Sequence, residues 1–307
     1  MQLVVTEKPS VAQAISHVIG AKERKDGYME GNGFLVSWCV GHLVELAQPE
    51  MYSEAWKKWS YESLPMIPEQ WQHEVKKETA TQYKILKNLM HDTRVESVVC
   101  ATDAGREGEL IFRLVYEQAG CRKPMKRLWI SSMEESAIRD GFENLKPGSD
   151  YDSLYQSALC RQQADWLVGL NATRALTCKY NAQLSCGRVQ TPTLAMIAKR
   201  EEEIRKFVPK SYYGLQLQTE GVVFTWKDEK SGSYRSFQKE RIENIQKKLS
   251  GKKLQIIKVD TKVKKQGAPQ LYDLTQLQRE ANQRFGFSAK ETLNIMQRLY
   301  ENHKVLT

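Results

Sequence analysis

Short apolar runs separated by polar segments recur through the first part of the chain. Runs of this kind are typical of strands buried in a sheet, and four are predicted: QLVVTE (2–7), FLVSWCV (34–40), ESVVCAT (96–102) and RLWIS (127–131). Three segments have helical periodicity: 10–20 with Ser10 at its cap, 108–120 closed by Gly120, and 132–145 with a capping box of Ser132 and Glu135. Alternating strands and helices predict an α/β fold with a mostly parallel sheet covered on both faces.

The pattern changes after KPGS (146–149), a segment of turn-forming residues. Residues 151–205 are predicted to be helical with a break at 181–193, and residues 211–226 alternate in the manner of strands. A further strand candidate at 252–265, a linker at 266–270 and two helices at 272–284 and 288–303 complete the chain. The last helix is predicted to have a capping box of Ser288 and Glu291 and an apolar stripe that includes Tyr300.

Length and composition narrow the class of protein. A chain of 307 residues with 41% hydrophobic content can bury a substantial core and form two or more domains. It has no apolar run of membrane-spanning length, and Glu7 and Lys8 interrupt the start where a signal peptide would be apolar. The six cysteines are far apart with none at CxxC spacing, so neither a zinc site nor a disulfide framework is favoured. We expect a cytoplasmic protein.

The charge balance suggests a polyanionic partner. The chain has 46 Lys and Arg against 37 Asp and Glu, a formal net charge of +9. Phosphate contacts use Lys and Arg, so nucleic acid is one interpretation. The other is a basic surface that only keeps the protein in solution.

Against this balance, ATDAGREGEL (101–110) places Asp103, Glu107 and Glu109 close together. Residues at the carboxyl ends of parallel strands face the crevice where ligands bind, and both Glu7 and Asp103 end a predicted strand. With Glu107 they form a candidate site for Mg²⁺, which prefers carboxylate and water oxygens. Alternatively, Asp103 caps the following helix and the two glutamates complement its dipole. That alternative leaves the two glycines, Gly105 and Gly108, unexplained.

Five motifs together carry a resemblance to a known family: EKPS (7–10), GHLVEL (41–46), ATDAGREGEL (101–110), RLWISS (127–132) and QLSCGRVQTPTLAMI (183–197). They resemble the amino-terminal part of bacterial type IA DNA topoisomerases of the topoisomerase III group, over nearly the whole chain. The resemblance implies a Toprim domain at 1–150, a helical DNA-binding domain at 151–210, the first part of a β-rich gate-arch domain at 211–270, and the start of a helical gate domain at 271–307.

The resemblance also implies site residues. Glu7, Asp103 and Glu107 match the strand-end glutamate and the outer acids of the Toprim DxDxE pattern, and they would hold Mg²⁺. Gly105 stands where the middle acid is expected, so we expect one ion. The catalytic residues implied are Glu7, Glu107 and Lys8, whose ammonium would stabilise the departing 3′ oxygen; a solvated lysine at a strand end is the alternative. Arg106 would either form a structural ion pair or reach a phosphate.

For DNA binding, the family's groove for a single strand maps onto GRVQTP and its neighbours. We expect contacts from Ser185, Gly187, Arg188, Val189, Gln190, Thr191, Arg161 and Arg174. A helix start with a surface arginine is the alternative for GRVQ. His42 lies either near the cleft or in an ordinary turn. Trp56, Trp59 and Tyr61 either stack on bases or, more in keeping with their type, anchor a loop.

The implied function is that of an isomerase. It is an ATP-independent DNA topoisomerase that cleaves one strand through a 5′-phosphotyrosine link, in order to relax negative supercoils or decatenate DNA. The absence of a GxxxxGK[ST] loop agrees with this. The family tyrosine is expected beyond Thr307, with Tyr300 packing in the preceding helix, so this chain is expected to be a fragment without its nucleophile. The alternative function is a non-catalytic module that binds single-stranded nucleic acid.

Overall fold

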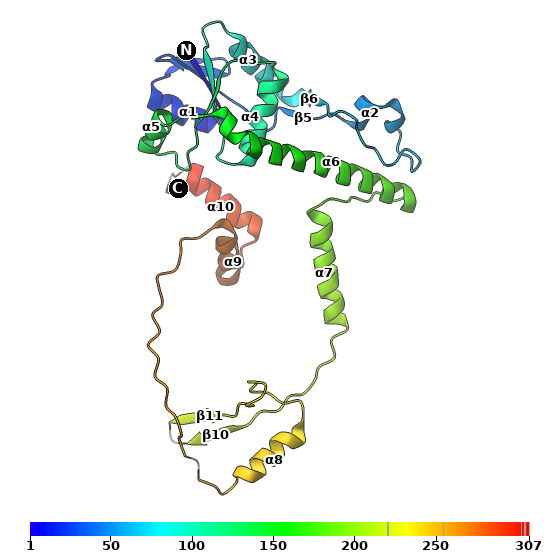
Figure 1. Cartoon of the computed structure of the whole chain (residues 1–307), viewed down its shortest axis with the longest axis vertical. Coiled ribbons are helices and arrows are strands. Elements are labelled where there is room, and N and C mark those ends of the chain that lie inside the picture. Colours follow the sequence, from blue (N-terminus) through cyan, green and yellow to red (C-terminus); the bar gives the residue numbers. More distant parts are fainter. Residues whose placement is uncertain (220, 254, 302, 304, 307) are drawn as a thin grey trace. The chain divides into compact units, whose positions relative to one another are not determined.

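The computed structural model describes residues 1–219, 221–253, 255–301, 303 and 305–306, without the side chain of residue 301. It contains two compact units (Figure 1). One comprises Met1–Leu194 with the chain from Asn294 onward, and the other comprises Ala195–Leu293. No helix of the described residues is long and apolar enough to cross a bilayer.

A seven-stranded sheet forms the centre of the first unit, in the order β2-β3-β4-β1-β7-β8-β9. The four inner strands β4 (Phe34–Trp38), β1 (Gln2–Thr6), β7 (Ser97–Ala101) and β8 (Met125–Arg127) are mutually parallel. The edge strands β2 (Glu23–Lys25), β3 (Tyr28–Gly31) and β9 (Lys146–Pro147) run antiparallel to their neighbours. The predicted parallel sheet is confirmed at its centre. The antiparallel edge strands were not predicted.

Helices cover both faces of this sheet, as predicted. On one face, α1 (Pro9–Ile19) and α5 (Glu135–Glu143) bury Ile15 and Ile138 against Val4 of the central strand. On the other face, α3 (Ala80–His91), α4 (Arg106–Gln118) and the start of α6 (Asp152–Tyr180) pack against Leu3 and Val5. Successive residues of β1 thus face opposite cores, which is why its sequence is apolar without interruption.

An arm between two short strands packs along α6. The strands β5 (Val44–Leu46) and β6 (His73–Val75) pair antiparallel, and α2 (Pro49–Tyr52) lies between them in the sequence. The Trp166 indole donates to the Ala47 carbonyl at 3.1 Å, and the Asn171 amide bonds both the N–H and the carbonyl of Met66. These contacts fix the arm to the helix.

The remaining elements follow the break after α6. They are α7 (Gln190–Arg205), the antiparallel hairpin of β10 (Gln216–Thr219) and β11 (Val222–Thr225), α8 (Lys239–Leu249), α9 (Leu274–Phe285) and α10 (Ala289–Glu301). The strand pattern at 211–226 is confirmed, and the helical break is confirmed over 181–189, since α7 begins at Gln190. Helix α8 was not expected from the sequence.

Several sequence predictions at element ends were wrong. Lys8, not Ser10, is the N-cap of α1, because Pro9 suits the first helical position. Strand β8 ends at Arg127, so most of RLWIS lies beyond it. Helix α5 begins at Glu135 without a capping box; the Ser132 hydroxyl accepts from the Glu134 amide instead.

Two further predictions in the last third of the chain also failed. The strand expected at 252–265 is irregular backbone in the residues described there, and residue 254 lies outside them. Tyr300 is 45% exposed rather than packed. For the cap of α10, the Ser288 hydroxyl does accept from the Glu291 amide at 3.1 Å.

Candidate metal and nucleic-acid site

Two carboxylates lie at the carboxyl edge of the parallel strands. β1 and β7 pair with Thr6 opposite Ala101, so Glu7 and Asp103 follow neighbouring strand ends. Burial raises the pKa of the Glu7 carboxyl above its ordinary value, and the negative charge of Asp103 raises it further. The Lys8 ammonium acts in the opposite direction. The two acids are therefore close enough to repel each other, with Lys8 near them.

The loop that carries Asp103 is shaped by Gly108. A Cβ on Gly108 would lie 2.3 Å from the Asp103 carbonyl oxygen, a distance that real Cβ atoms do not reach. The Thr102 hydroxyl donates to the Gly108 carbonyl at 2.7 Å and closes the same loop. The N-cap of α4 is Gly105 rather than Asp103, so the interpretation of Asp103 as a capping residue is wrong. Its carboxylate is not used to start the helix.

Glu109 has a structural position. Its side chain is fully buried and lies 3.0 Å from the Arg113 guanidinium and 2.9 Å from the Arg127 guanidinium. Arg127, itself buried, donates to the carbonyls of Thr102 at 2.7 Å and Asp103 at 2.8 Å. Sequence reasoning missed this role of Arg127, although an arginine at the start of an apolar run was its visible signal. The buried Glu109 and Arg127 side chains thus fix the backbone of Asp103.

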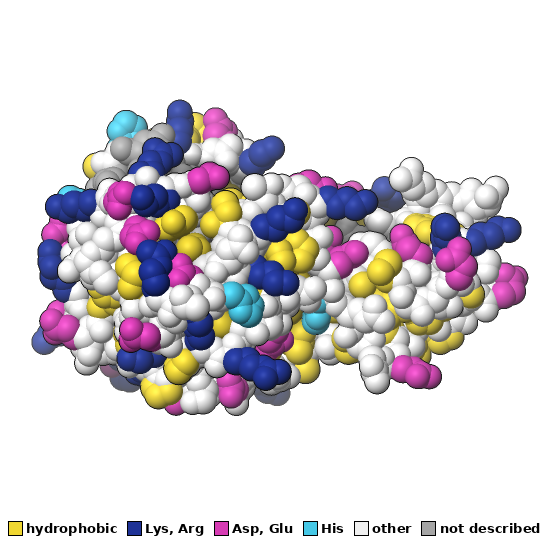
Figure 2. Space-filling model, turned by 90° about the horizontal axis from the view of Figure 1, so that it is seen from above, with side chains coloured by type: hydrophobic (Ala, Val, Ile, Leu, Met, Phe, Trp, Pro, Cys, Tyr) yellow, Lys and Arg dark blue, Asp and Glu magenta, His cyan; other side chains and the backbone are white. Residues whose placement is uncertain are grey.

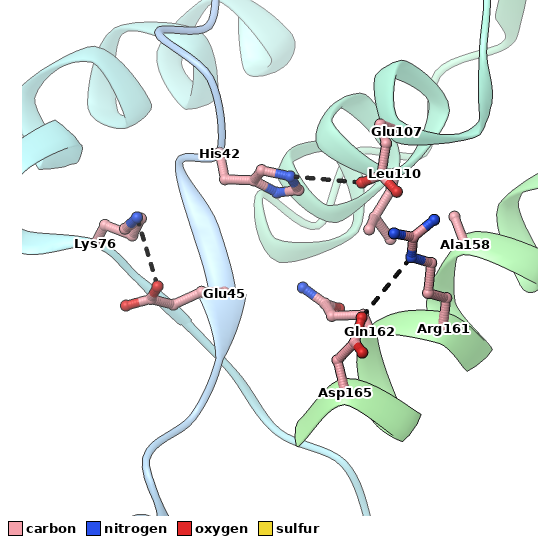
Figure 3. Close-up of a pocket in the computed structure, with 9 residues that line it drawn as sticks. All are labelled: His42, Glu45, Lys76, Glu107, Leu110, Ala158, Arg161, Gln162 and Asp165. Carbon is pink, nitrogen blue, oxygen red and sulfur yellow. Dashed lines mark ion pairs between the residues drawn. The ribbon is translucent and has the colours of Figure 1, made fainter. Parts of the chain in front are cut away.

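Glu107 faces a pocket of about 300 Å³ in the first unit (Figure 3). Its carboxylate lies 4.0 Å from the His42 imidazole and 3.9 Å from the Arg106 guanidinium. His42 is thus beside the cleft rather than in a remote turn. Across the described residues, no three His, Cys, Asp or Glu side chains converge closely enough to hold a metal ion. The three acids expected as ligands are therefore not gathered around one point.

The far wall of this pocket is formed by α6. Arg161, Gln162 and Asp165 line it opposite His42, and Arg161 lies 3.7 Å from Asp165 (Figure 3). Asp165 also lines a second pocket of about 700 Å³, together with Arg188 and its neighbours. One residue thus joins the pocket beside Glu107 to the pocket beside GRVQTP.

The second pocket brings together four of the eight predicted DNA-binding residues, namely Gly187, Arg188, Val189 and Gln190. The Arg188 guanidinium donates to the Asp165 carboxylate at 2.5 Å, and this bond lowers the pKa of Asp165. Asp165 stays ionised and orients Arg188. The Arg188 guanidinium has further N–H groups that can donate to a phosphate.

Helix α6 also holds the segment that precedes Arg188. The Thr173 hydroxyl bonds both the N–H and the carbonyl of Cys186, at 3.0 and 3.2 Å, and the Thr177 hydroxyl donates to the Leu184 carbonyl at 3.0 Å. The Gly187 amide donates to the Thr191 hydroxyl at 3.0 Å. Ser185 lies in this segment and is exposed. Sequence reasoning missed the two α6 threonines, which lie seven and three residues before Tyr180, the last residue of the helix.

Arg174 differs from the other predicted contacts. It is 3% exposed, donates to the Trp56 carbonyl at 2.5 Å, and lies with its guanidinium carbon 5.2 Å from the Trp59 ring centroid. Its guanidinium is buried and bound to groups within the protein, so the expected DNA contact by Arg174 is not supported. Trp56 packs against Tyr52 in the arm, while Trp59 and Tyr61 are about half exposed.

On the face that Figure 2 shows, charge alone does not mark a binding surface. Figure 2 shows Lys and Arg side chains interspersed with Asp and Glu over the face seen there, rather than gathered in one basic patch. The candidate site is therefore defined by the two pockets and the acids beside them.

A parallel-centred sheet with a strand-end glutamate and an acidic loop before the next helix defines a Toprim domain, and the Toprim family model matches residues 2–133. The chain belongs to the DNA topoisomerase family, whose model matches residues 149–307. The resemblance found from the motifs is thus confirmed.

Relatives and solved structures agree with this family. The chain is 53% identical to DNA topoisomerase 3 of Bacillus cereus over 306 residues, and 50% identical to that of Bacillus subtilis over 305 residues. Each match covers 99% of this chain and 42% of the relative. Full-length topoisomerase I of Thermotoga maritima matches with a TM-score of 0.66 at 26% identity, over 97% of this chain and 46% of that one. The chain therefore spans less than half the length of these proteins.

Proposed function

We propose that residues 1–307 form the part of an ATP-independent type IA DNA topoisomerase that binds one DNA strand beside a magnesium site. The whole protein would cleave that strand through a 5′-phosphotyrosine link and relax negative supercoils or decatenate DNA. The observation that carries the proposal is Asp165, which lines both the pocket of Glu107 and the pocket of Arg188. A strand held by Arg188 would have a continuous path to the acids.

In this proposal the strand is bound mainly through its phosphates. Arg188 and Arg161 supply guanidinium groups, each already oriented by Asp165. Ser185, Gln190 and Thr191 add neutral hydrogen-bonding groups, and Gly187 and Val189 leave the backbone accessible. Such contacts do not read sequence, so the site preference of the enzyme would arise elsewhere.

Glu7 and Asp103 are the residues that would hold Mg²⁺, with Glu107 bound directly or through water. Their fit is supported by the pKa of Glu7, which burial and then the negative charge of Asp103 raise, since a cation would relieve the repulsion between the two acids. The open space around Gly105 is also compatible with an ion and its waters, since a Cβ there meets no atom within 4 Å. When bound, Mg²⁺ would supply positive charge for the phosphate oxygens. Lys8, exposed at the start of α1, would stabilise the 3′ oxygen as it leaves.

We propose that the nucleophile is not among the residues of the two pockets. None of the described residues that line the two pockets is a tyrosine. A phosphodiester becomes covalently attached only if a side chain attacks it, so the groups that line these two pockets are expected to bind DNA without forming an adduct. A denaturation-resistant adduct with this polypeptide would place the nucleophile within it, with Tyr300 the first residue to test.

The domain division is likewise proposed, with a Toprim domain at 1–150, a helical DNA-binding domain at 151–210, part of a gate-arch domain at 211–270 and part of a gate domain at 271–307. The motifs that define the first two regions support it. Limited proteolysis would test it, since the proposed boundaries should be cleaved first.

Binding of labelled oligonucleotides tests the proposal directly. We expect single strands to bind more tightly than duplex, with affinity falling steeply as salt rises. Arg188→Ala should weaken binding across sequences and reduce the salt dependence by about one phosphate contact. The control is Arg139→Ala, which removes an equal charge from α5, where Arg139 is an exposed partner of Glu135. Equal affinities for Arg188→Ala and the unaltered protein would refute the assignment.

A further inference from the structure

One large aromatic side chain lies at the same sheet edge as the acids but has no role in the proposed function. Trp129 follows β8 by two residues and is 42% exposed. β8 pairs in parallel with β7, and β7 pairs in parallel with β1. Glu7, Asp103 and Trp129 therefore follow the carboxyl ends of three adjacent strands, over a width of about 10 Å.

The Trp129 indole is held in a fixed orientation. Its ring stacks on the Tyr151 ring with centroids 5.0 Å apart and planes 20° from parallel. The Arg127 guanidinium carbon lies 5.0 Å from the Trp129 centroid and 5.9 Å from the Tyr151 centroid. A guanidinium across Trp129 from Tyr151 would lie much further from the tyrosine. Arg127 is thus not on the far side of the indole from Tyr151, and Trp129 remains 42% exposed.

The same guanidinium connects Trp129 to the acidic loop. Arg127 donates to the Asp103 carbonyl at 2.8 Å while it contacts the indole. Arg127 is 1% exposed and also paired with Glu109, so it has little freedom to move. A ligand on the exposed part of Trp129 would therefore be positioned relative to Asp103 through one rigid side chain.

We propose that Trp129 is a stacking platform for one base of the single strand whose phosphate lies at Glu7 and Asp103. The inference rests on the proposed function, because it takes from it the presence of a single strand at these acids. Every base has a π face, and an indole that is already ordered loses little entropy when a base stacks on it. Trp129 is then a positioning residue that fixes the register of the strand relative to the acids.

A scan with abasic sites tests the platform. Short single strands, each with one base removed at a different position, are bound to the unaltered protein, Trp129→Ala and Trp129→Phe. In the unaltered protein, one position should weaken binding about tenfold when its base is removed. In Trp129→Ala that position should lose its effect, because base and indole contribute only together. Trp129→Phe should restore part of it.

The controls separate this inference from the proposed function. Arg188→Ala should lower affinity at every position of the scan and keep the single sensitive one. If single strands bind and Arg188 matters, yet the abasic profile is the same with and without the indole, the platform is refuted while the proposed function stands. If the unaltered protein does not bind single strands, both are refuted. A further outcome is that Trp129→Ala lowers affinity equally at every position of the scan while its melting temperature equals that of the unaltered protein. That result would refute the platform too, since stacking acts at one base.

Discussion

At the residue scale, Gly108 and Gly105 differ in whether the structure has room for a side chain at their position. Gly108→Ala would place a methyl group 2.3 Å from the Asp103 carbonyl oxygen, so the loop must shift. We expect a loss of about 1–3 kcal/mol in the free energy of unfolding and weaker Mg²⁺ binding. Gly105→Ala is the matched control for stability, because a Cβ there meets nothing within 4 Å and its φ of −176° is extended backbone. Thermal unfolding of both variants and Mg²⁺ titration of Gly108→Ala check this, and equal losses of stability would contradict it.

The Glu7 carboxyl makes metal binding depend on pH. Burial and the charge of Asp103 raise its pKa, so it keeps a proton at pH values where an ordinary glutamate is ionised. Because the proton and Mg²⁺ compete for the carboxylate, Mg²⁺ affinity should fall as pH is lowered, and the fall should begin above the ordinary glutamate range. Calorimetric titrations over pH measure it. Glu7→Gln should bind weakly with a flatter profile, and an unchanged profile in that variant would rule out Glu7 as the cause.

The candidate acids were identifiable from the sequence because strand ends and an acidic loop leave a local pattern. The role of Glu109 was not identifiable in this way. It is two residues from Glu107 and of the same type, but it faces the core, where Arg113 and Arg127 neutralise it. Arg127 is distant in sequence, so only the folded sheet brings the pair together. The same applies to Arg174, whose burial depends on the arm.

At the scale of elements, the buried ions between α4 and β8 should contribute strongly to stability. Glu109→Gln would leave the buried Arg127 guanidinium without its charged partner and Arg113 with Asp152 alone, and we expect a loss of about 3–5 kcal/mol in the free energy of unfolding. Glu203→Gln removes the partner of Arg200 at 3.1 Å on the exposed surface of α7, and should cost about 0–1 kcal/mol. Chemical denaturation of both variants provides the measurement. A similarly small cost at Glu109 would mean that the network does not support the loop.

Element prediction succeeded where burial leaves a strong pattern. The inner strands β1, β4 and β7 are apolar because helices cover both of their faces. The hairpin of β2 and β3 was missed because it lies at the sheet edge, where largely exposed polar residues such as those of ERK carry no strand signal. The strand predicted at 252–265 has the alternation of a strand but pairs with no neighbour among the described residues. The alternation of a sequence does not show whether a neighbouring strand is present to pair with it.

At the scale of the whole molecule, the central claim is that the acids and the GRVQTP segment serve one DNA strand. Mg²⁺ and a single strand should then increase each other's affinity by the same factor, because linkage between two binding sites is reciprocal. Net charge does not predict this coupling, since basic and acidic side chains are interspersed on the surface that Figure 2 shows.

The most direct test is therefore to titrate single-stranded DNA at increasing Mg²⁺, and Mg²⁺ with and without DNA, in the unaltered protein, Asp103→Asn and Arg188→Ala. We predict equal enhancement in both directions for the unaltered protein, about fivefold or more. Asp103→Asn should retain DNA binding but lose the enhancement, whereas Arg188→Ala should retain Mg²⁺ binding and lose DNA affinity. Enhancement that survives in Asp103→Asn, or its absence from the unaltered protein, would contradict a shared site.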